Sequence, residues 1–499
     1  RTRGNALFLR HLVDQELQAG QLVQRSGRWE DLGHNTISPS LRDLVRLQVG
    51  AVTAPVLDVV DIVAVGEPLD RRCLAELVDL GELDIGALGV AEQRGLIATS
   101  PAGLVRVGHP LYGEVRLAEC GPIRLRGLRA RVATVQARLR DVVAVDPLRH
   151  GLLWLESDLA DDPTVLLAAA HAAQDRLDCV LAQRLFEAAA EAGAGIAAHL
   201  GQAYALLLLN RADEAQHILD TVDADDLPDL GFMSPEILKA SNLMWSLRRP
   251  EESERVIDEA LRTSTGRNTQ NLKAFKAFQH IMAGRPAAIA ALLDTVDFDA
   301  LDPRIHILGQ CAWTFAHGES GRPAAAARWA EDGYRAVART PEDSFQGTGL
   351  AEIHVFAMLA AGHVEQALVA AHTIAAKCST QSGITASMAA AIMGMALIGS
   401  GDLSNGVDVL RNADRQFESY GEIAGFYYRF RIVYTEALAR IGDVDGAKAQ
   451  LAATRASHHP SYVFMEPAYL LCAAWVTAAD ARLDEARELC RRAAEFARE

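Results

Sequence analysis

Histidine, cysteine and carboxylate side chains are the residues of this 499-residue chain that could serve as nucleophiles, general bases or metal ligands. Their spacing supports none of these roles. His458 and His459 are adjacent and precede Pro460, a pattern typical of a connection between helices, and no Cys/His cluster at metal-ligand spacing accompanies them. Glu352 and His354 stand two positions apart in a predicted helix, so their side chains face different sides.

Motifs for hydrolysis and phosphate binding are also absent from the sequence. It contains no H-E-x-x-H or G-x-S-x-G segment, and its seven cysteines include no Cys-x-x-Cys pair, which fits free thiols in a reducing compartment. It has no G-x-x-x-x-G-K-[ST] loop and no Gly-Lys dipeptide, so nothing in it cradles the phosphates of ATP. We therefore expect a chain that is not an enzyme, holds no cofactor or metal of its own, and cannot hydrolyse ATP alone.

The charge pattern argues against nucleic acid and membrane partners. The formal net charge of −16 repels phosphates over most of the surface. Basic residues gather in one stretch around a predicted linker helix: Arg124, Arg126, Arg129, Arg131, Arg138 and Arg140. We expect them to pair with acidic groups of the protein. The alternative is that they bind phosphate. The carboxylate pairs at 161–162 and 225–226 fit solvated loops or helix starts. Every run of 18 residues contains a charge or turn signal, so we expect no membrane span and a cytoplasmic protein.

The elements that would position any site are helices in a repeat. Short turns between two amphipathic stretches recur nine times, at spacings from 35 residues (175 to 210) to 41 residues (321 to 362). They start at Asp175, Asn210, Arg248, Gly284, Gly321, Gly362, Gly401, Gly442 and Ala481. A Gly or Asn at this position ends the first helix with a positive φ, and an Asp or Pro then begins the second helix. The pattern predicts about nine antiparallel helical hairpins over residues 175–499.

Small residues recur at two fixed places in this repeat. Five residues after the turn start stand Ala215, Ser253, Ala326, Ala367, Gly406, Ala447 and Ala486, and seven residues before it stand Ala203, Ser241, Ala277, Gly394 and Ala474. Small side chains at both places let two helices approach closely. The columns resemble the tetratricopeptide repeat (TPR), although each unit is a few residues longer. Solenoids of this kind present concave surfaces to peptides, proteins or small effectors.

The first 120 residues follow another pattern. Residues 21–30 alternate around Ser26-Gly27, which predicts a hairpin. Helical patterns over 41–50, 53–65, 70–79 and 83–94 are followed by two short strands, Leu96–Thr99 and Leu104–Val107, around a Pro-Ala-Gly turn. Helices closed by a β-hairpin predict a winged helix. Six acidic residues against three arginines in 70–94 indicate that this winged helix does not read DNA directly.

The order of these parts resembles the large ATP-binding LuxR-type transcription regulators of the STAND class, the MalT-like group. The opening T-x-G-N-x-L-F-L-x-x-L-V is similar to the region of their Gly-x-Pro motif, and the end of the winged helix, residues 107–112, to the segment after their nucleotide-binding core. A long TPR-like sensor then follows. Since the chain has no initiator Met, no P-loop and no LuxR-type recognition helix after its last repeat, we expect it to be the middle of a longer protein.

The resemblance implies a nucleotide contact, with ATP or ADP bound in the parent protein. Gly4, Asn5 and Ala6 occupy the Gly-x-Pro positions, with Ala6 where the family has the Pro that packs on adenine. His109 matches a His that approaches the nucleotide β-phosphate and holds the off state. The alternative is that Asn5 and Ala6 cap a helix and that His109 is a helix-start residue satisfied by the backbone.

Aromatic side chains on the first helices of the repeats are the candidate ligand contacts. In a chain that is only 6% aromatic, they cluster in the third to sixth repeats: Trp245, Phe275, Phe278, Trp313, Phe315 and Phe356. At least two of them are expected at the concave surface, in a pocket near the middle of the array. The alternative is that they fill the core between repeats, where aromatic side chains stabilise most.

Together these patterns predict an all-α, non-enzymatic regulatory chain with an N-terminal winged-helix domain, a small β-hairpin and a TPR-like α-solenoid. The expected domains are 1–36, the end of an ATPase-associated helical region with a hairpin; 37–120, the winged helix; 121–165, linker helices; and 166–499, the sensor. An inducer or protein partner would bind the solenoid, the active state would self-associate, and DNA would be bound only through a domain outside this chain. The alternative is a free-standing TPR-like scaffold whose N-terminal domain is a folding cap.

Overall fold

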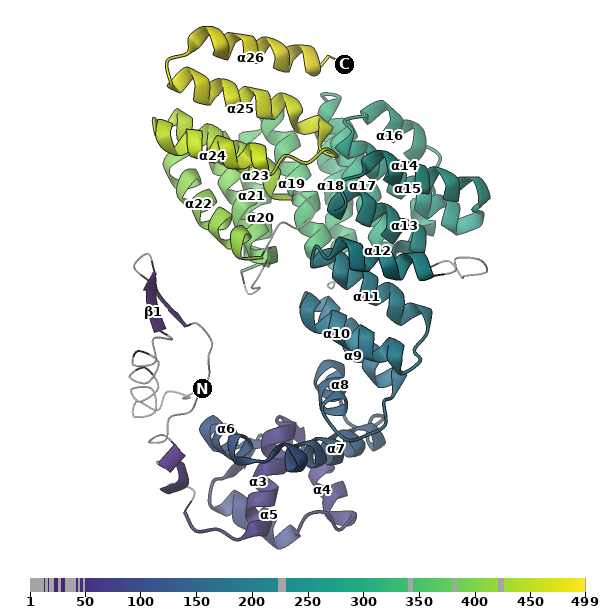
Figure 1. The fold of residues 1–499 in the computed structure, drawn as a ribbon, viewed down its shortest axis with the longest axis vertical. Coiled ribbons are helices and arrows are strands. Elements are labelled where there is room, and N and C mark those ends of the chain that lie inside the picture. Colours follow the sequence, from purple (N-terminus) through teal and green to yellow (C-terminus); the bar gives the residue numbers. More distant parts are fainter. Residues whose placement is uncertain are drawn as a thin grey trace. The chain divides into compact units, whose positions relative to one another are not determined.

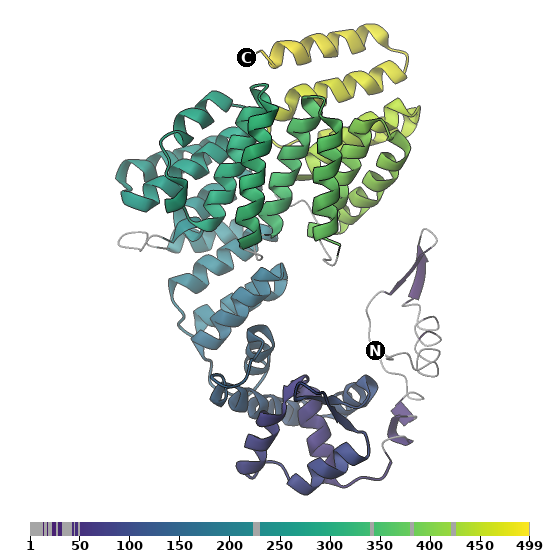
Figure 2. The same cartoon turned by 180° about the vertical axis from the view of Figure 1, so that it is seen from behind.

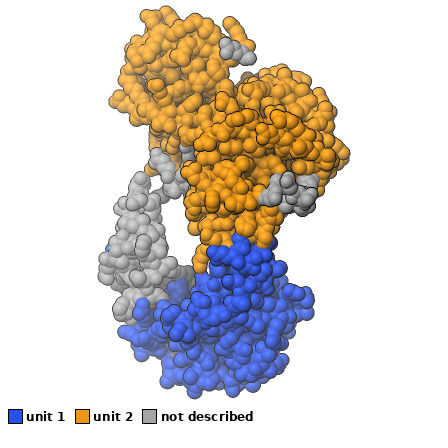
Figure 3. Space-filling model, turned by 45° about the vertical axis from the view of Figure 1, so that its right-hand side comes forward, with its two compact units in different colours: residues 1–172, 188–194 blue, residues 173–187, 195–499 orange. Residues whose placement is uncertain are grey.

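The computed structural model describes residues 50–498 except 223–229, 340–343, 380–383 and 421–425, together with 22–25, 28–31 and residues 13, 17, 42, 43 and 45–47. Gly4, Asn5 and Ala6 lie outside the described residues. The described chain is mostly helical (Figures 1 and 2). It forms two compact units, residues 1–172 with 188–194 (unit 1) and residues 173–187 with 195–499 (unit 2), which Figure 3 colours separately.

The hairpin predicted around Ser26-Gly27 is confirmed. Strand β1 (Leu22–Arg25) pairs antiparallel with β2 (Arg28–Asp31), with Arg25 opposite Arg28 and Leu22 opposite Asp31.

From residue 54 to residue 155, unit 1 contains helices and a small sheet in the chain order α3 (Ala54–Gly66), β3 (Leu69–Asp70), α4 (Arg71–Asp79), α5 (Ile85–Gln93), β4 (Ile97–Thr99), β5 (Leu104–Val107), α6 (Pro110–Glu119), α7 (Pro122–Arg138) and α8 (Pro147–Leu155). The predicted hairpin is confirmed, since Ile97 lies opposite Val107 and Thr99 opposite Val105. A third strand was not predicted: β3 pairs with β5, so that the strand order is β3-β5-β4. Asp70 ends this two-residue strand and also caps α4 by accepting from Arg72 N–H.

The arginines of α7 tie unit 1 together, as the acidic composition of its neighbours predicts. Arg124 contacts Asp58 and Asp61 of α3, and Arg138 contacts Glu76 of α4. Three further pairs join α7 to the segments that follow α4 and α8: Arg131–Glu82, Arg129–Glu156 and Arg126–Asp158. Five of the six arginines in the basic stretch are therefore engaged by carboxylates rather than presented as a phosphate-binding face.

The solenoid consists of helices that follow one another in pairs. The pairs are α9 (Pro163–Asp175) and α10 (Cys179–Glu191); α11 (Ile196–Leu208) and α12 (Ala212–Thr221); α13 (Pro235–Ser241) extended by the π-helical turn η2 (Asn242–Ser246), and α14 (Pro250–Thr263); α15 (Gly266–Met282) and α16 (Pro286–Leu293); α17 (Pro303–Glu319) and α18 (Pro323–Arg339); α19 (Ser344–Ala360) and α20 (Val364–Lys377); α21 (Ile384–Ser400) and α22 (Leu403–Tyr420); α23 (Phe426–Arg440) and α24 (Val444–Ala456); α25 (Glu466–Ala479) and α26 (Leu483–Phe496). Short 3-10 turns, η1 (Gly231–Met233), η3 (Phe298–Ala300) and η5 (Val463–Met465), lie in the connections. Over the described part of 163–498 the pairs number nine and no strand occurs, which confirms the TPR-like repeat.

Positive φ marks each turn within a pair, as the turn residues predict. Eight of the nine predicted turn starts have φ between 56° and 91°, from Asn210 to Ala481. In the first pair the residue with positive φ is Leu177, two positions after the predicted Asp175. The left-handed residue lets the next N–H reach back into the first helix: Arg482 N–H donates to Thr477 O at 3.0 Å, and His363 N–H to Met358 O at 2.8 Å.

The two small-residue columns are packing positions. All the residues of both columns are buried in the described structure. Gly394 of α21 shows why the size matters, because a Cβ built there would lie 2.6 Å from Leu410 of α22. A Cβ at Gly406 would meet Ile398 of α21 at 2.5 Å. The helices of this pair thus approach to a distance that only glycine permits at these two positions.

The Ala481 turn offers a test of this turn geometry. Ala481 adopts φ 62° without the freedom of glycine. We expect Ala481→Gly to raise the free energy of unfolding of the solenoid by about 0.5–1 kcal/mol, because glycine relieves the steric cost of the left-handed conformation. Ala452→Gly, at an exposed position inside α24, is the matched control and should lower it by about 1 kcal/mol. Urea denaturation followed by circular dichroism measures both, and a loss of stability in the Ala481 variant would contradict this account.

The connection between α24 and α25, residues 457–465, reaches back to the third pair of the solenoid. We call it the clasp. His459 Nε2 donates to Trp245 O at 2.8 Å, and Ser461 Oγ donates to Met244 O at 2.9 Å. In the π-helical turn η2, Leu247 N–H bonds to Asn242 O and Arg249 N–H to Leu243 O, so the carbonyls of Met244 and Trp245 can accept from the clasp. The clasp therefore joins segments that are 214 residues apart.

Candidate functional site

A mainly apolar cavity of about 120 Å³ lies inside unit 2. Its helical lining comes from α11, α13 with η2, α15, α17, α19 and α23, and each of these is the first helix of its pair. Phe232 of η1 and Tyr462 and Phe464 of the clasp complete the wall. The cavity thus lies on the side of the solenoid that the first helices face, near the middle of the array.

Three of the six aromatic residues proposed as ligand contacts line this cavity: Trp245, Phe275 and Phe278. Phe275 is buried, whereas Trp245 and Phe278 are partly exposed and meet edge to face with ring centroids 6.2 Å apart. Trp245 also lies 6.1 Å from the ring of Tyr462 in the clasp.

The other three proposed residues are not among the lining residues. Trp313 is buried in a stack with Trp329 of α18, at a centroid distance of 5.5 Å, which is the inter-helix packing that was the alternative for this set. Phe315 packs edge to face on Phe464 of the clasp at 5.4 Å. Phe356 lies under the guanidinium of Arg429, 4.3 Å from ring centroid to Cζ.

One buried ion pair adds charge to the apolar wall. Arg429 Nε lies 3.1 Å from Glu352 Oε1, and the two side chains are only 4% and 8% exposed. The rings of Phe356 and Phe464 lie 4.3 and 5.0 Å from the guanidinium carbon. Burial raises the pKa of Glu352, and the charge of Arg429 opposes this shift.

The clasp holds its two aromatic residues at the cavity through the hydrogen bonds of His459. Nδ1 of His459 accepts from Ser461 N–H at 3.2 Å, while Nε2 is bonded to Trp245 O. Both ring nitrogens are therefore used, and burial lowers the pKa of this imidazole. His459 thus positions a loop and has no nitrogen left to ligate a metal.

Two titratable groups at or beside the cavity are not activated for chemistry. Cys311 lines it, but complete burial raises the pKa of this thiol, so the nucleophilic thiolate is not formed at neutral pH. His354 lies on α19, two residues after Glu352. Its Nδ1 accepts a hydrogen bond from Tyr334 Oη at 3.1 Å, and burial lowers the pKa of this imidazole to about 4. No group of three or more His, Cys, Asp or Glu side chains suited to a metal ion occurs among the described residues.

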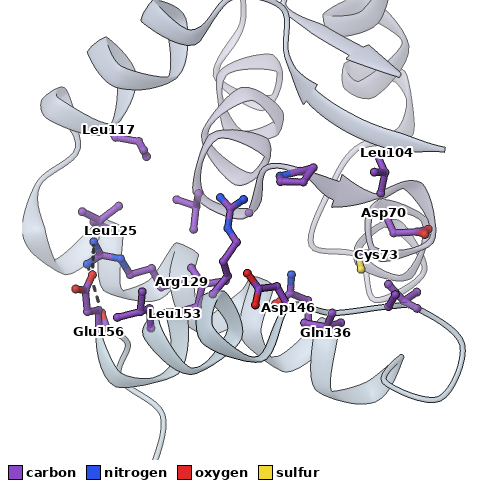
Figure 4. A pocket seen from close by; sticks show the side chains of 18 residues that line it. Asp70, Cys73, Leu104, Leu117, Leu125, Arg129, Gln136, Asp146, Leu153 and Glu156 are labelled. Atoms are coloured by element: carbon purple, nitrogen blue, oxygen red, sulfur yellow. Dashed lines mark hydrogen bonds and ion pairs between the residues drawn. The ribbon is translucent and has the colours of Figure 1, made fainter. Parts of the chain in front are cut away.

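Unit 1 has a cavity of its own, of about 510 Å³, between α3, α4, α7 and α8. In Figure 4, Asp70 and Cys73 lie across it from Arg129 and Glu156. These charges are already engaged: Arg129 Nη2 lies 2.7 Å from Glu156 Oε2, and Asp70 pairs with Arg72. The pairing lowers the pKa of Asp70, through its hydrogen bonds with Arg72. We therefore take the cavity of unit 2, whose arginine still has N–H groups to offer, as the candidate site.

His109, the residue matched to a nucleotide-sensing histidine, is the N-cap of α6. Its Nδ1 accepts from Leu111 N–H at 3.2 Å, and its ring lies 5.6 Å from that of Tyr112. The side chain is partly exposed at the start of the helix that follows β5. This position matches the alternative given for His109, a residue at the start of a helix that is satisfied by the backbone.

The ion pair and the clasp were not predicted from the sequence. Arg429 and Glu352 lie in different repeats, and no local pattern connects them. Tyr462 and Phe464, two positions apart in the connection between two helices, were the available signal, because an exposed loop rarely holds two aromatic residues so close together.

No helix among the described residues is long and apolar enough to cross a membrane. No protein-family model matches the chain, and no curated protein matches it. Among solved structures, the chain is similar to a crystal structure of the APC/C hetero-tetramer Cut9–Hcn1, with a TM-score of 0.46 and 13% identity over 78% of this chain and 72% of that one. It is also similar to a Signal Transduction ATPase with Numerous Domains (STAND) protein with a tetratricopeptide repeat sensor from Pyrococcus horikoshii, with a TM-score of 0.39 and 13% identity over 92% of this chain and 68% of that one.

Proposed function

We propose that this chain is the sensor part of an ATP-dependent transcription regulator and that its solenoid binds an inducer. The observation that carries the proposal is the cavity at the middle of the solenoid, lined by Trp245, Phe275 and Phe278 and closed on one side by the clasp. Mainly apolar cavities with a few convergent polar groups are the usual form of small-molecule sites. An inducer in this cavity would contact six of the nine helix pairs and the clasp at once, so its binding would favour one arrangement of the array.

Unit 1 supports the same proposal through its topology. Three helices, α3, α4 and α5, precede the β4–β5 hairpin, and β3 joins the hairpin from between α3 and α4. We assign this arrangement to a winged helix. Its third helix, α5, has no basic residue, and the arginines of α7 are paired with carboxylates. A winged helix of this composition fits contact with another protein domain better than contact with DNA, which would be bound by a separate domain.

His109 is the residue through which unit 1 would report the nucleotide state. It begins α6 directly after the hairpin, so a shift of the hairpin moves its ring together with the start of the helix. In the proposed mechanism, nucleotide bound to an ATPase domain outside this chain contacts His109 in the off state. Inducer binding to the solenoid then favours self-association, which presents the DNA-binding domains. The chain itself would carry out no catalysis.

The alternative function is a scaffold that binds proteins on its solenoid, with unit 1 as a folding cap. The wide use of helical-repeat surfaces for peptides and proteins favours this alternative. The cavity separates the two functions, because a scaffold needs a groove for a chain segment, whereas about 120 Å³ holds only a molecule of about the size of one ring.

The test is nucleotide binding by the natural protein that contains this sequence. We expect it to bind ATP and to form larger assemblies with ATP than with ADP, measured by equilibrium dialysis and sedimentation velocity. A His109→Ala variant should shift the balance towards the assembled state in ADP. The control is His199→Ala, a partly exposed position on α11 like that of His109. A natural protein that binds no nucleotide and keeps one assembly state would refute the regulator and leave the scaffold.

A further inference from the structure

The guanidinium of Arg429 is buried but incompletely bonded. The side chain is 4% exposed, and Nε and Nη1 have no partner in hydrogen-bonding geometry among the described residues, although Glu352 lies 3.1 Å from Nε. Burying a charged donor without an acceptor costs several kcal/mol, so such groups are rare unless something else satisfies them.

The surroundings of Arg429 leave one kind of partner open. Both neighbouring rings, Phe356 and Phe464, contribute cation–π contacts, which do not satisfy the N–H groups. Hydrogen bonds to a guanidinium form in its plane, and its five donors serve two carboxylates on two edges. Glu352 lies on the Nε side as an ion-pair partner, and Nη1 remains for a second acceptor.

The rest of the cavity restricts the body of that ligand. Apart from Arg429 and Glu352, the wall is dominated by aromatic and aliphatic side chains, among them Tyr204, Phe232 and Ile353. A cavity of about 120 Å³ is close to the roughly 150 Å³ that holds one benzene molecule in an apolar protein core. The ligand body is therefore apolar and of the size of one ring.

From these observations we propose that the cavity of unit 2 binds a small monocarboxylate with a one-ring or short branched apolar body, and that Arg429 recognises its carboxylate. This proposal rests on the proposed function, since it names the chemical class of the inducer at the same site. Glu352 compensates the charge of Arg429 while the cavity is empty. The aromatic residues Trp245 and Phe278 contact the apolar body.

The experiment compares two probes of the same size on the full 499-residue chain, benzoate and benzyl alcohol, by isothermal titration calorimetry. We expect benzoate to bind at least tenfold more tightly, because only benzoate offers Arg429 a charged acceptor. Glu352→Gln should strengthen benzoate binding by about tenfold, because it removes the like charge beside the ligand, and should leave benzyl alcohol binding unchanged.

The double variant Arg429→Met/Glu352→Gln removes both charges together, so that neither is left buried alone. It should bind the two probes equally, and its retained binding of benzyl alcohol shows that the cavity is folded. The matched control is Arg431→Met/Asp414→Asn, which removes an ion pair between α23 and α22, 3.0 Å between Nε and Oδ1, outside the cavity. This control should keep the benzoate preference.

Equal affinity for the two probes in the unaltered chain, binding of neither probe, or a benzoate preference that persists in the Arg429 double variant would each overturn the proposal. None of these outcomes bears on nucleotide binding by the natural protein. If the natural protein binds nucleotide but the probes fail, the protein is a regulator whose inducer belongs to another class. If it binds no nucleotide, the regulator itself is refuted.

Discussion

Replacing Asp61 by alanine should destabilise unit 1 by about 3 kcal/mol. Asp61 is fully buried in α3 and accepts two parallel hydrogen bonds from Arg116, at 2.8 and 2.9 Å, and one from Arg124 at 2.9 Å. Its loss leaves the half-buried guanidinium of Arg116, whose pKa the Asp61 hydrogen bonds raise, without its main partner. Removing one partner of such a group costs more than the pair itself contributes, because the remaining charge stays desolvated.

Asp58→Ala is the control for this experiment. Asp58 contacts Arg124 from the same helix but is 41% exposed, so its loss should cost less than 1 kcal/mol. Hydrogen exchange in increasing urea, followed by mass spectrometry on peptides of α3 and α6, reports unit 1 separately from the solenoid. Equal effects of the two substitutions would show that burial of the carboxylate does not determine the stability of this domain.

The solenoid should lose stability in mild acid through His354. Burial lowers the pKa of this imidazole from 6.5 to about 4, so the unfolded chain takes up the proton first. A depressed folded-state pKa gives stability that is present above pH 6.5 and is lost as the pH falls towards 4. The shift corresponds to roughly 3 kcal/mol in total, of which about 2 kcal/mol is lost between pH 7.5 and pH 5.

His354→Asn should remove this part of the acid sensitivity, since the amide oxygen can accept from Tyr334 Oη in place of Nδ1 and does not titrate. Urea denaturation at pH 7.5 and pH 5 measures the difference, and His372→Asn, at an exposed position of α20, is the matched control. If the variant loses as much stability in acid as the unaltered chain, the buried imidazole is not the group responsible.

Local signals predicted the solenoid well because its geometry is set within each repeat. A turn that needs positive φ selects Gly or Asn, and helices that touch at Gly394 or Gly406 select small residues, so both constraints are visible in the sequence. The same logic found the β4–β5 hairpin. It missed β3, because Leu69 and Asp70 gain their strand geometry only from pairing with β5, and two residues carry no periodicity.

The candidate site was only half predictable for the opposite reason. Its aromatic residues were found from their position on first helices, but Trp313 stacks on Trp329 while Trp245 lines the cavity, and the sequence pattern is the same for both. The difference depends on which neighbour lies opposite: Trp313 meets the paired helix of its own repeat, whereas Trp245 meets Phe278 of the next repeat and Tyr462 of the clasp. Arg429 and Glu352 also come from different repeats, so no pattern within one repeat could have joined them.

The clasp also changes how the array should respond to force. Solenoids whose repeats touch only their neighbours extend like springs and unfold repeat by repeat from either end. Here the hydrogen bonds from His459 and Ser461 to η2 bridge 214 residues, so the five repeats between them cannot be stretched until these bonds break. When the solenoid is pulled from its ends, it should therefore be stiff until the hydrogen bonds of the clasp break in one event, and elastic after that event.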